Sequence, residues 1–226
     1  MKILFPHIPK CAGSSIKSQL EKREDVFLDY FNHPTWAYQP DKEEGRKKQD
    51  ELKETIRNLD LWIVFGHFSI CTYYDLPYDL AIILLRDPLE RAVSHYHYFK
   101  QLLPDNDTTR RRHKEVGPIK ENRMSIEEFV ELDHIKYFYS KYYLNNIALD
   151  EKILVVPMDD MKSSFSKIME VSNLKLDYTV RANKSKYYGN FDHMRNVFKV
   201  DAELYNYLIS RPNKKLHSDS LSSPVN

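Results

Sequence analysis

The fold is decided by the stretch Leu4-Phe5-Pro6-His7-Ile8-Pro9-Lys10-Cys11-Ala12-Gly13-Ser14-Ser15-Ile16. Its apolar run ends at Pro9, a short loop of small residues carries Lys10, and an amphipathic helix is expected to begin near Ser14 or Ser15. A strand, a tight loop and a helix N-terminus form an anion site, because the first N–H groups of a helix lack intrahelical partners and the helix dipole favours negative charge. The stretch therefore predicts a phosphate-binding loop. The alternative is an ordinary strand-to-helix turn with capping serines and a solvated Lys10.

The length and composition indicate an ordinary globular protein. The chain has 226 residues, 42% of them hydrophobic, with Lys+Arg 34 against Asp+Glu 33. This length suits a single α/β domain, predicted over residues 1–210, and the polar tail 211–226 is expected to be disordered. The net charge of +1 gives no global attraction for nucleic acid, so a basic site has to be local.

Targeting and metal-binding signals are missing from the sequence. The first strand follows Met1 at once, which leaves no room for a signal peptide, and no apolar run approaches the length of a membrane span. A cytoplasmic location without a membrane span is therefore expected. The two cysteines, Cys11 and Cys71, stand in unlike contexts and indicate neither a disulfide framework nor a metal site.

The remaining chain alternates apolar runs with amphipathic segments. Strands are expected at 2–8, 26–30, 61–65, 80–85 and 153–156, and helices at 15–22, 41–59, 88–103, 125–132, 135–146, 158–171 and 201–209. This alternation predicts a three-layer, P-loop-like α/β fold with a central, mostly parallel sheet flanked by helices. The most apolar run, Leu80–Leu85, is expected to be the central strand, and the polar stretch Pro104–Asn122 a loop.

Polar residues follow three of the predicted strands. Because ligands bind at the carboxyl ends of parallel strands, Pro9–Ser15, Gly66–His67 and Arg86–Asp87 are expected to meet at one edge of the sheet. Arg86 can fork onto a phosphate, and Ser94, two turns into the next helix, can donate a hydroxyl to the same group. Alternatively, Arg86 pairs with a neighbouring acid.

The two loops resemble a known family. A Walker A loop has the order G-x-x-x-x-G-K-[ST], whereas here the lysine precedes the glycine in Pro-Lys-Cys-Ala-Gly-Ser-Ser. That order, and Leu-Leu-Arg-Asp-Pro-Leu-Glu-Arg-Ala-Val-Ser-His-Tyr at 84–96, resemble the two signatures of sulfotransferases that use 3′-phosphoadenosine 5′-phosphosulfate (PAPS). The wording His-Ile-Pro-Lys is most similar to the carbohydrate sulfotransferases, including the heparan and uronyl 2-O-sulfotransferases.

The resemblance implies a set of donor-binding residues and no metal. The N–H groups from Ala12 to Ile16 would hold the 5′-phosphate, Lys10 would stabilise the leaving oxygen, and Arg86 with Ser94 would bind the 3′-phosphate. A late loop that closes over the nucleotide would contribute Lys184 and Ser185. The implied donor-binding set is Lys10, Cys11, Ala12, Gly13, Ser14, Ser15, Ile16, Arg86, Ser94, Lys184 and Ser185.

The resemblance also implies that His67 is the catalytic base, acting with Lys10 on a hydroxyl-bearing acceptor, in particular a carbohydrate. A hydroxyl is a poor nucleophile, and a base whose pKa lies near the ambient pH removes its proton most effectively. A structural histidine at a strand end is the alternative, in which case Glu115 and His113 are the next candidates. The run 110–114 is either a solvated charged face or the binding site of a sulfated or carboxylated acceptor.

Three further histidine and arginine side chains are expected to be structural. His95 and His97 flank Tyr96 on a capped helix without a carboxylate partner, and Arg91 is expected to pair with neighbouring acids. Two other function classes remain open at this level. A P-loop kinase or NTPase would need a Gly-Lys-Ser/Thr and a magnesium-binding acid, and a non-catalytic nucleotide- or glycan-binding module would keep the loop without turnover.

Overall fold

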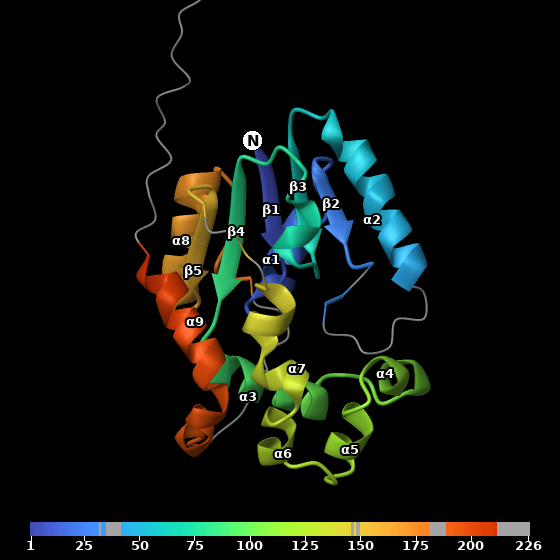
Figure 1. Cartoon of the computed structure of the whole chain (residues 1–226), viewed down its shortest axis with the longest axis vertical. Coiled ribbons are helices and arrows are strands. Elements are labelled where there is room, and N and C mark those ends of the chain that lie inside the picture. The colour runs from blue at the N-terminus through green and yellow to red at the C-terminus, as the bar shows by residue number, and fades with distance from the viewer. Residues whose placement is uncertain (32, 35–41, 146, 148–149, 181–188, 212–226) are drawn as a thin grey trace, which may run out of the picture.

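The computed structural model describes residues 1–31, 33–34, 42–145, 147, 150–180 and 189–211. A five-stranded sheet lies at the centre of this part of the chain, with helices flanking it (Figure 1). Its strands are β1 (Lys2–Pro6), β2 (Val26–Asp29), β3 (Trp62–Gly66), β4 (Leu80–Leu85) and β5 (Ile153–Pro157). Every pairing is parallel, in the order β2-β3-β1-β4-β5. The predicted α/β fold with a central parallel sheet is confirmed.

The position of β4 corrects one prediction. β1 occupies the middle of the sheet, and β4 lies between β1 and the edge strand β5. All six residues of β4 are nevertheless buried, from Leu80 to Leu85. An apolar run therefore reports that both faces of a strand are covered, and it does not report where the strand lies in the sheet.

Helices connect the strands and extend beyond them. The α-helices are α1 (Gly13–Leu20), α2 (Lys42–Arg57), α3 (Pro88–Gln101), α4 (Asp107–Arg112), α5 (Val116–Lys120), α6 (Ile126–Val130), α7 (Asp133–Lys136), α8 (Met161–Ser172) and α9 (Lys199–Ser210). Two 3₁₀ segments, η1 (Ile70–Tyr73) and η3 (Asp192–Phe198), and one π-helical segment, η2 (Phe138–Tyr143), complete the described elements.

The stretch Pro104–Asn122, expected to be a loop, contains α4 and α5. The Asn106 side chain caps α4 by accepting a hydrogen bond from the backbone N–H of Thr109. The Arg110 guanidinium pairs with both Asp105 and Glu121, so it ties α4 to the end of α5. The prediction missed α4 because its residues are mostly charged, and it missed α5 because this helix has only five residues and contains Gly117 and Pro118.

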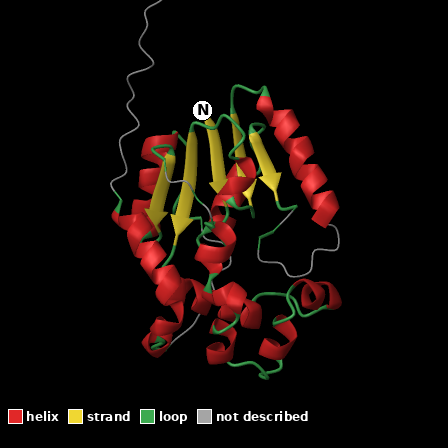
Figure 2. Ribbon diagram, viewed as in Figure 1, coloured by secondary structure: helices red, strands yellow, loops and turns green. Residues whose placement is uncertain are grey.

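The strands and a separate group of helices occupy different halves of the molecule. Figure 2 shows all strand arrowheads directed toward a lower region that contains only helices and loops. This helical region, α3 to α7, has a hydrophobic core of its own, in which Val93, Phe99 and Phe129 are buried. The carboxyl ends of the strands therefore face the helical region, and a ligand bound at the sheet edge meets both (Figures 1 and 2).

Some predictions lie outside the described residues. These are Lys184 and Ser185 of the predicted late loop, and residues 212–226 of the tail. Among the helices that the structure does describe, none combines the length and the apolar character needed to span a membrane.

Candidate active site

The loop between β1 and α1 has an unusual backbone. Lys10 and Ala12 both adopt positive φ angles, of 71° and 57°. Left-handed residues alternating with right-handed ones turn successive N–H groups toward one side and form an anion-binding concavity, at a cost of about 1–3 kcal/mol for each strained residue. Such strain is typical of functional sites and agrees with a phosphate-binding loop.

The N–H groups of the loop divide into two sets. The backbone N–H groups of Ser15 and Ile16 both donate to the Ala12 carbonyl, at 3.0 and 3.2 Å, and so close the first turn of α1. Within the described part of the chain, the N–H groups of Ala12 and Gly13 have no hydrogen-bond partner. The helix begins at Gly13, not at Ser14 or Ser15. Of the N–H groups that the resemblance implies, from Ala12 to Ile16, those of Ala12 and Gly13 are therefore available to an anion.

Residue 13 has to be glycine because the His7 side chain occupies the space where a Cβ atom would lie. A Cβ atom at this position would lie 1.7 Å from Cδ2 and 1.9 Å from Nε2 of His7. The imidazole of His7 therefore fills the space that a side chain at residue 13 would need. This contact packs the start of α1 against the end of β1.

Three histidines gather at the carboxyl ends of β1, β2 and β3. The rings of His7 and His67 stack with their centroids 4.3 Å apart, and the His33 ring lies 4.5 Å from that of His67. His7 Nδ1 is 2.9 Å from the Tyr30 hydroxyl, and His33 Nε2 is 3.0 Å from the Tyr143 hydroxyl. Burial lowers the pKa of both His7 and His33 well below the usual value, so the cluster is neutral at pH 7.

The tautomer of His67 follows from one hydrogen bond. Its Nδ1 lies 2.7 Å from the backbone oxygen of His7, and a carbonyl oxygen only accepts. Nδ1 therefore carries the proton, and Nε2 of the neutral ring presents a lone pair. Burial lowers the pKa of His67 to about 4, against a smaller opposing effect of this hydrogen bond. At neutral pH His67 is thus in the form that can accept a proton, but it is a weaker base than the near-neutral histidine expected from the sequence.

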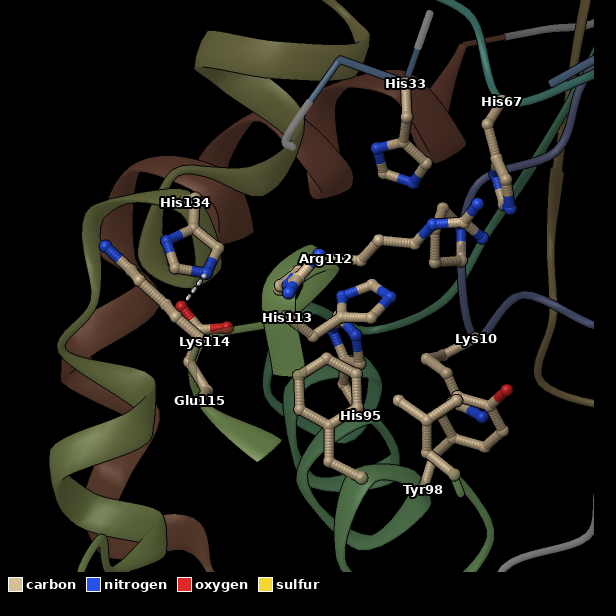
Figure 3. A pocket seen from close by; sticks show the side chains of 14 residues that line it. Lys10, His33, His67, His95, Tyr98, Arg112, His113, Lys114, Glu115 and His134 are labelled. Atoms are coloured by element: carbon tan, nitrogen blue, oxygen red, sulfur yellow. Dashed lines mark ion pairs between the residues drawn. The ribbon is translucent and has the colours of Figure 1, made fainter. Parts of the chain in front are cut away.

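His67 opens onto a cavity of about 340 Å³ that lies between the sheet edge and the helical region. Figure 3 shows the side chains that surround it. The lining residues are Pro9, Lys10, His33, His67, His95, Tyr98, Phe99, Leu103, Arg111, Arg112, His113, Lys114, Glu115 and His134. The cavity therefore joins the predicted lysine and the predicted base in one space.

Lys10 reaches this cavity beside an aromatic ring. Its Nζ lies 4.0 Å from the centroid of the Tyr98 ring on α3, a cation–π contact. Burial lowers the pKa of Lys10 to about 8, and the nearby Arg86 guanidinium adds to the effect. The ammonium group is therefore poorly solvated, and an anion beside it would be held strongly.

The second predicted phosphate motif is located at the start of α3. Asp87 caps the helix by accepting a hydrogen bond from the N–H of Glu90, and Pro88 occupies the first turn. The Arg86 guanidinium is largely buried and pairs with Glu90 at 3.1 Å, so the acid pairing weighed in the sequence is present in this structure. Ser94 is buried on α3. A 3′-phosphate would compete with an exposed carboxylate for Arg86.

Arg91 is structural, but its partners differ from those predicted. No acid pairs with its guanidinium in the described structure. Its carbon Cζ lies 3.8 Å from the centroid of the Phe138 ring, and Nη2 donates to the Ile135 backbone oxygen at 3.0 Å. His95 combines two roles, since it packs against Phe99 and also lines the cavity.

The helical wall of the cavity carries charged groups. Arg111, Arg112 and Lys114 line the cavity and are also exposed, so both interpretations of the run 110–114, a solvated face and an acceptor site, stay open. In Figure 3 the Arg112 side chain extends in the direction of His33 and His67. Deeper in the same wall, the buried carboxylate of Glu115 lies 3.3 Å from His134 Nε2.

His7 and His33 were not predicted as site residues, although a signal for them exists. The rule that the ends of parallel strands share one edge applies to every strand of the sheet. His7 was missed because the predicted first strand, 2–8, included it, whereas β1 ends at Pro6. His33 was missed because the strand-end rule was not applied to the second strand, β2, which ends at Asp29.

The comparisons with known proteins identify the family. A family model described as "Sulfotransferase family" matches residues 1–168. The chain belongs to the sulfotransferase family. This matched segment contains the predicted phosphate-binding loop, the histidine cluster, the Arg86 motif and the whole lining of the cavity.

Solved sulfotransferase structures are also similar to the chain. One is a sulfotransferase from Alicyclobacillus acidocaldarius, with a TM-score of 0.46 and 12% identity, over 93% of this chain and 96% of that one. Another is the mouse sulfotransferase SULT7A1 complexed with PAP, with a TM-score of 0.37 and 16% identity, over 93% of this chain and 65% of that one. No curated protein matches the sequence.

Proposed function

We propose that this sulfotransferase moves a sulfuryl group from PAPS to a hydroxyl group of an acceptor, and that the acceptor is a carbohydrate, the class that the His-Ile-Pro-Lys motif favours. One observation carries the proposal: Lys10 and His67 line the same cavity. A cation suited to a developing negative charge and a neutral base therefore face one space. The cavity volume, about 340 Å³, is within the range of small-molecule sites.

The donor-binding side is formed by the loop and by the start of α3. The N–H groups of Ala12 and Gly13, in their strained loop, suit the 5′-phosphate. Arg86 and Ser94 suit the 3′-phosphate, with Arg86 leaving Glu90 for the stronger anion. PAPS supplies the activated sulfuryl group, and the protein positions it. No metal is part of this proposal.

In the chemical step, His67 Nε2 accepts the proton of the acceptor hydroxyl while the hydroxyl oxygen forms a bond to sulfur. The bond from sulfur to the bridging oxygen breaks, and Lys10 neutralises the charge that develops on that oxygen. The products are a sulfate ester and adenosine 3′,5′-bisphosphate. As in phosphoryl transfer, the contribution of the protein is positioning and electrostatic stabilisation.

The acceptor side is formed by the helical wall. The Tyr98 and Phe99 rings offer an apolar surface against which a sugar ring can pack. Arg111, Arg112 and Lys114 favour an acceptor that carries a carboxylate or a sulfate group. Single variants of these residues test whether they bind the acceptor or are only a solvated charged surface.

Nucleotide binding tests the donor side. Titration calorimetry should give tighter binding of adenosine 3′,5′-bisphosphate than of AMP by about ten- to a hundredfold, the usual value of one charge-assisted, partly buried contact. In the Arg86→Ala variant this preference should disappear while AMP binds as before. Equal affinities of the wild type for the two nucleotides would contradict the proposal.

Turnover tests the acceptor side. The protein is incubated with radiolabelled PAPS and a panel of neutral, carboxylated and sulfated glycans and simple alcohols, and label transfer is measured. Transfer that depends on Lys10 is expected. Tight binding of the bisphosphate without transfer to any member of the panel would favour the non-catalytic binding module.

A further inference from the structure

The Tyr139 hydroxyl contacts both of the segments proposed to bind phosphate. It donates a hydrogen bond to the Arg86 backbone oxygen at 2.7 Å and lies 3.3 Å from the Arg86 backbone N–H, which donates to it. On its other side it lies 3.8 Å from Cys11 Sγ, within the phosphate-binding loop. Tyr139 is fully buried. One side chain, 53 residues beyond Arg86, thus connects the two motifs.

The hydrogen-bonding capacity of the hydroxyl matches these contacts. A phenol has one proton and two lone pairs. The proton goes to the Arg86 carbonyl, so the lone pairs are left for the Arg86 N–H and for the weak thiol donor of Cys11. Burial raises the pKa of both Cys11 and Tyr139, so both groups keep their protons at neutral pH.

The segment that carries Tyr139 is itself firmly held. It belongs to the π-helical segment η2, and such segments are frequent at functional sites. The Tyr139 backbone N–H donates to Asp201 Oδ2 at 2.7 Å, while Ser140 donates to Oδ1 through its N–H and its hydroxyl. Asp201 is a buried carboxylate of α9, and these hydrogen bonds offset the desolvation cost of burying it.

We propose that Tyr139 is a positioning residue that fixes the distance between the 3′-phosphate and 5′-phosphate subsites. The inference rests on the proposed function, because it assumes that Arg86 and the loop each bind a phosphate of one nucleotide. A nucleotide with both phosphates binds well only when Arg86 and the loop are held at the correct distance from each other, whereas AMP contacts the loop alone. Tyr139 therefore contributes to the selection of a 3′-phosphorylated donor without touching it.

The test is the ratio of the AMP dissociation constant to that of adenosine 3′,5′-bisphosphate, measured by calorimetry. In Tyr139→Phe this ratio should fall by about tenfold, since the loss of one buried hydrogen-bonding group changes an affinity by about this factor. AMP affinity should stay within about threefold of the wild-type value. With PAPS, KM should rise while kcat at saturation changes little.

Two controls separate positioning from general stability. Tyr73→Phe removes another buried tyrosine hydroxyl, which donates to Asp29 at 2.8 Å near the ends of β2 and β3. It should lower the melting temperature while the ratio stays unchanged. In an Arg86→Ala background, Tyr139→Phe should no longer change bisphosphate affinity, because no guanidinium remains to be positioned.

The outcomes divide clearly. A wild-type protein that does not prefer the bisphosphate refutes the proposed function itself. Two outcomes with a wild type that prefers the bisphosphate would refute only the inference about Tyr139. In the first, folded Tyr139→Phe keeps the full ratio; in the second, Tyr139→Phe lowers bisphosphate affinity equally in the Arg86→Ala background. If Tyr139→Phe does not fold, Asp201→Asn replaces it: this variant loosens η2 and should reduce the same ratio, and an unchanged ratio in folded Asp201→Asn overturns the inference.

Discussion

The two walls of the cavity are formed in different ways. On the sheet wall, His33 and His67 line the cavity, and the ring of the neighbouring His7 packs on that of His67; all three follow strands of the sheet. On the helical wall, Arg112 and Lys114 are exposed side chains at the end of α4, a helix without buried residues. The histidine cluster is thus neutral, with Lys10 as the cation on the sheet side, whereas the helical wall presents several exposed cations. From this difference we expect the sheet wall to carry the chemistry and the helical wall to select the acceptor.

The largest effect is expected on the sheet wall. His67→Ala should lower kcat by about 10²–10⁴-fold, the usual contribution of a positioned base. Its affinity for adenosine 3′,5′-bisphosphate should change little, because His67 lines the cavity and takes no part in the phosphate-binding loop. Steady-state kinetics and calorimetry measure the two quantities.

A matched control is available for this variant. His193 is an exposed histidine whose only described ion pair, with Glu127, is long, at 3.7 Å, and it does not line the cavity. His193→Ala should turn over normally. Folded His67→Ala with near wild-type turnover would remove His67 from the mechanism, and Glu115 and His113 in the same cavity would then be tested.

A smaller effect is expected on the helical wall. Arg112→Ala should raise KM for a carboxylated or sulfated acceptor by about five- to tenfold, since an exposed cation contributes less than a buried one. For a neutral acceptor KM should stay the same, and kcat should change little for both. Arg123→Ala, at an exposed arginine outside the cavity that pairs with Glu121, is the control. A rise in KM that does not depend on acceptor charge would refute the proposed selection.

The same contrast explains how much could be predicted from the sequence. Strand ends are predictable, because apolar runs mark strands and parallel strands share an edge; the loop at Lys10, His67 and Arg86 were found in this way. In the helical wall α4 was missed, because this short charged helix depends on its Asn106 cap and on ion pairs such as Arg110 with Asp105. Tyr139 gave no signal, since its position depends on a π-helical segment held by Asp201 from a distant helix.

The smallest effect at neutral pH concerns the titration of His67. Because burial lowers its pKa to about 4, kcat/KM should hardly change between pH 7 and 5.5. At pH 5.5 about 97% of such a histidine is neutral, against about 9% for an unperturbed one. The unfolded chain takes up this proton before the folded protein does, so folding stability should decrease as pH falls from about 6.5 to 4. On the alkaline side, kcat/KM should decline above about pH 8, where Lys10 loses its charge.

A pH profile alone does not assign the acid limb, because the pKa of His113 in the same cavity is also lowered to about 4. The variants make the assignment. If His67 is the base, the limb near pH 4 should vanish from the residual activity of His67→Ala and persist in His113→Ala. A limb near pH 6.5 in the wild type would instead indicate that the base is a histidine outside the buried cluster. The proposal that the sheet wall carries the chemistry and the helical wall selects the acceptor would then be wrong.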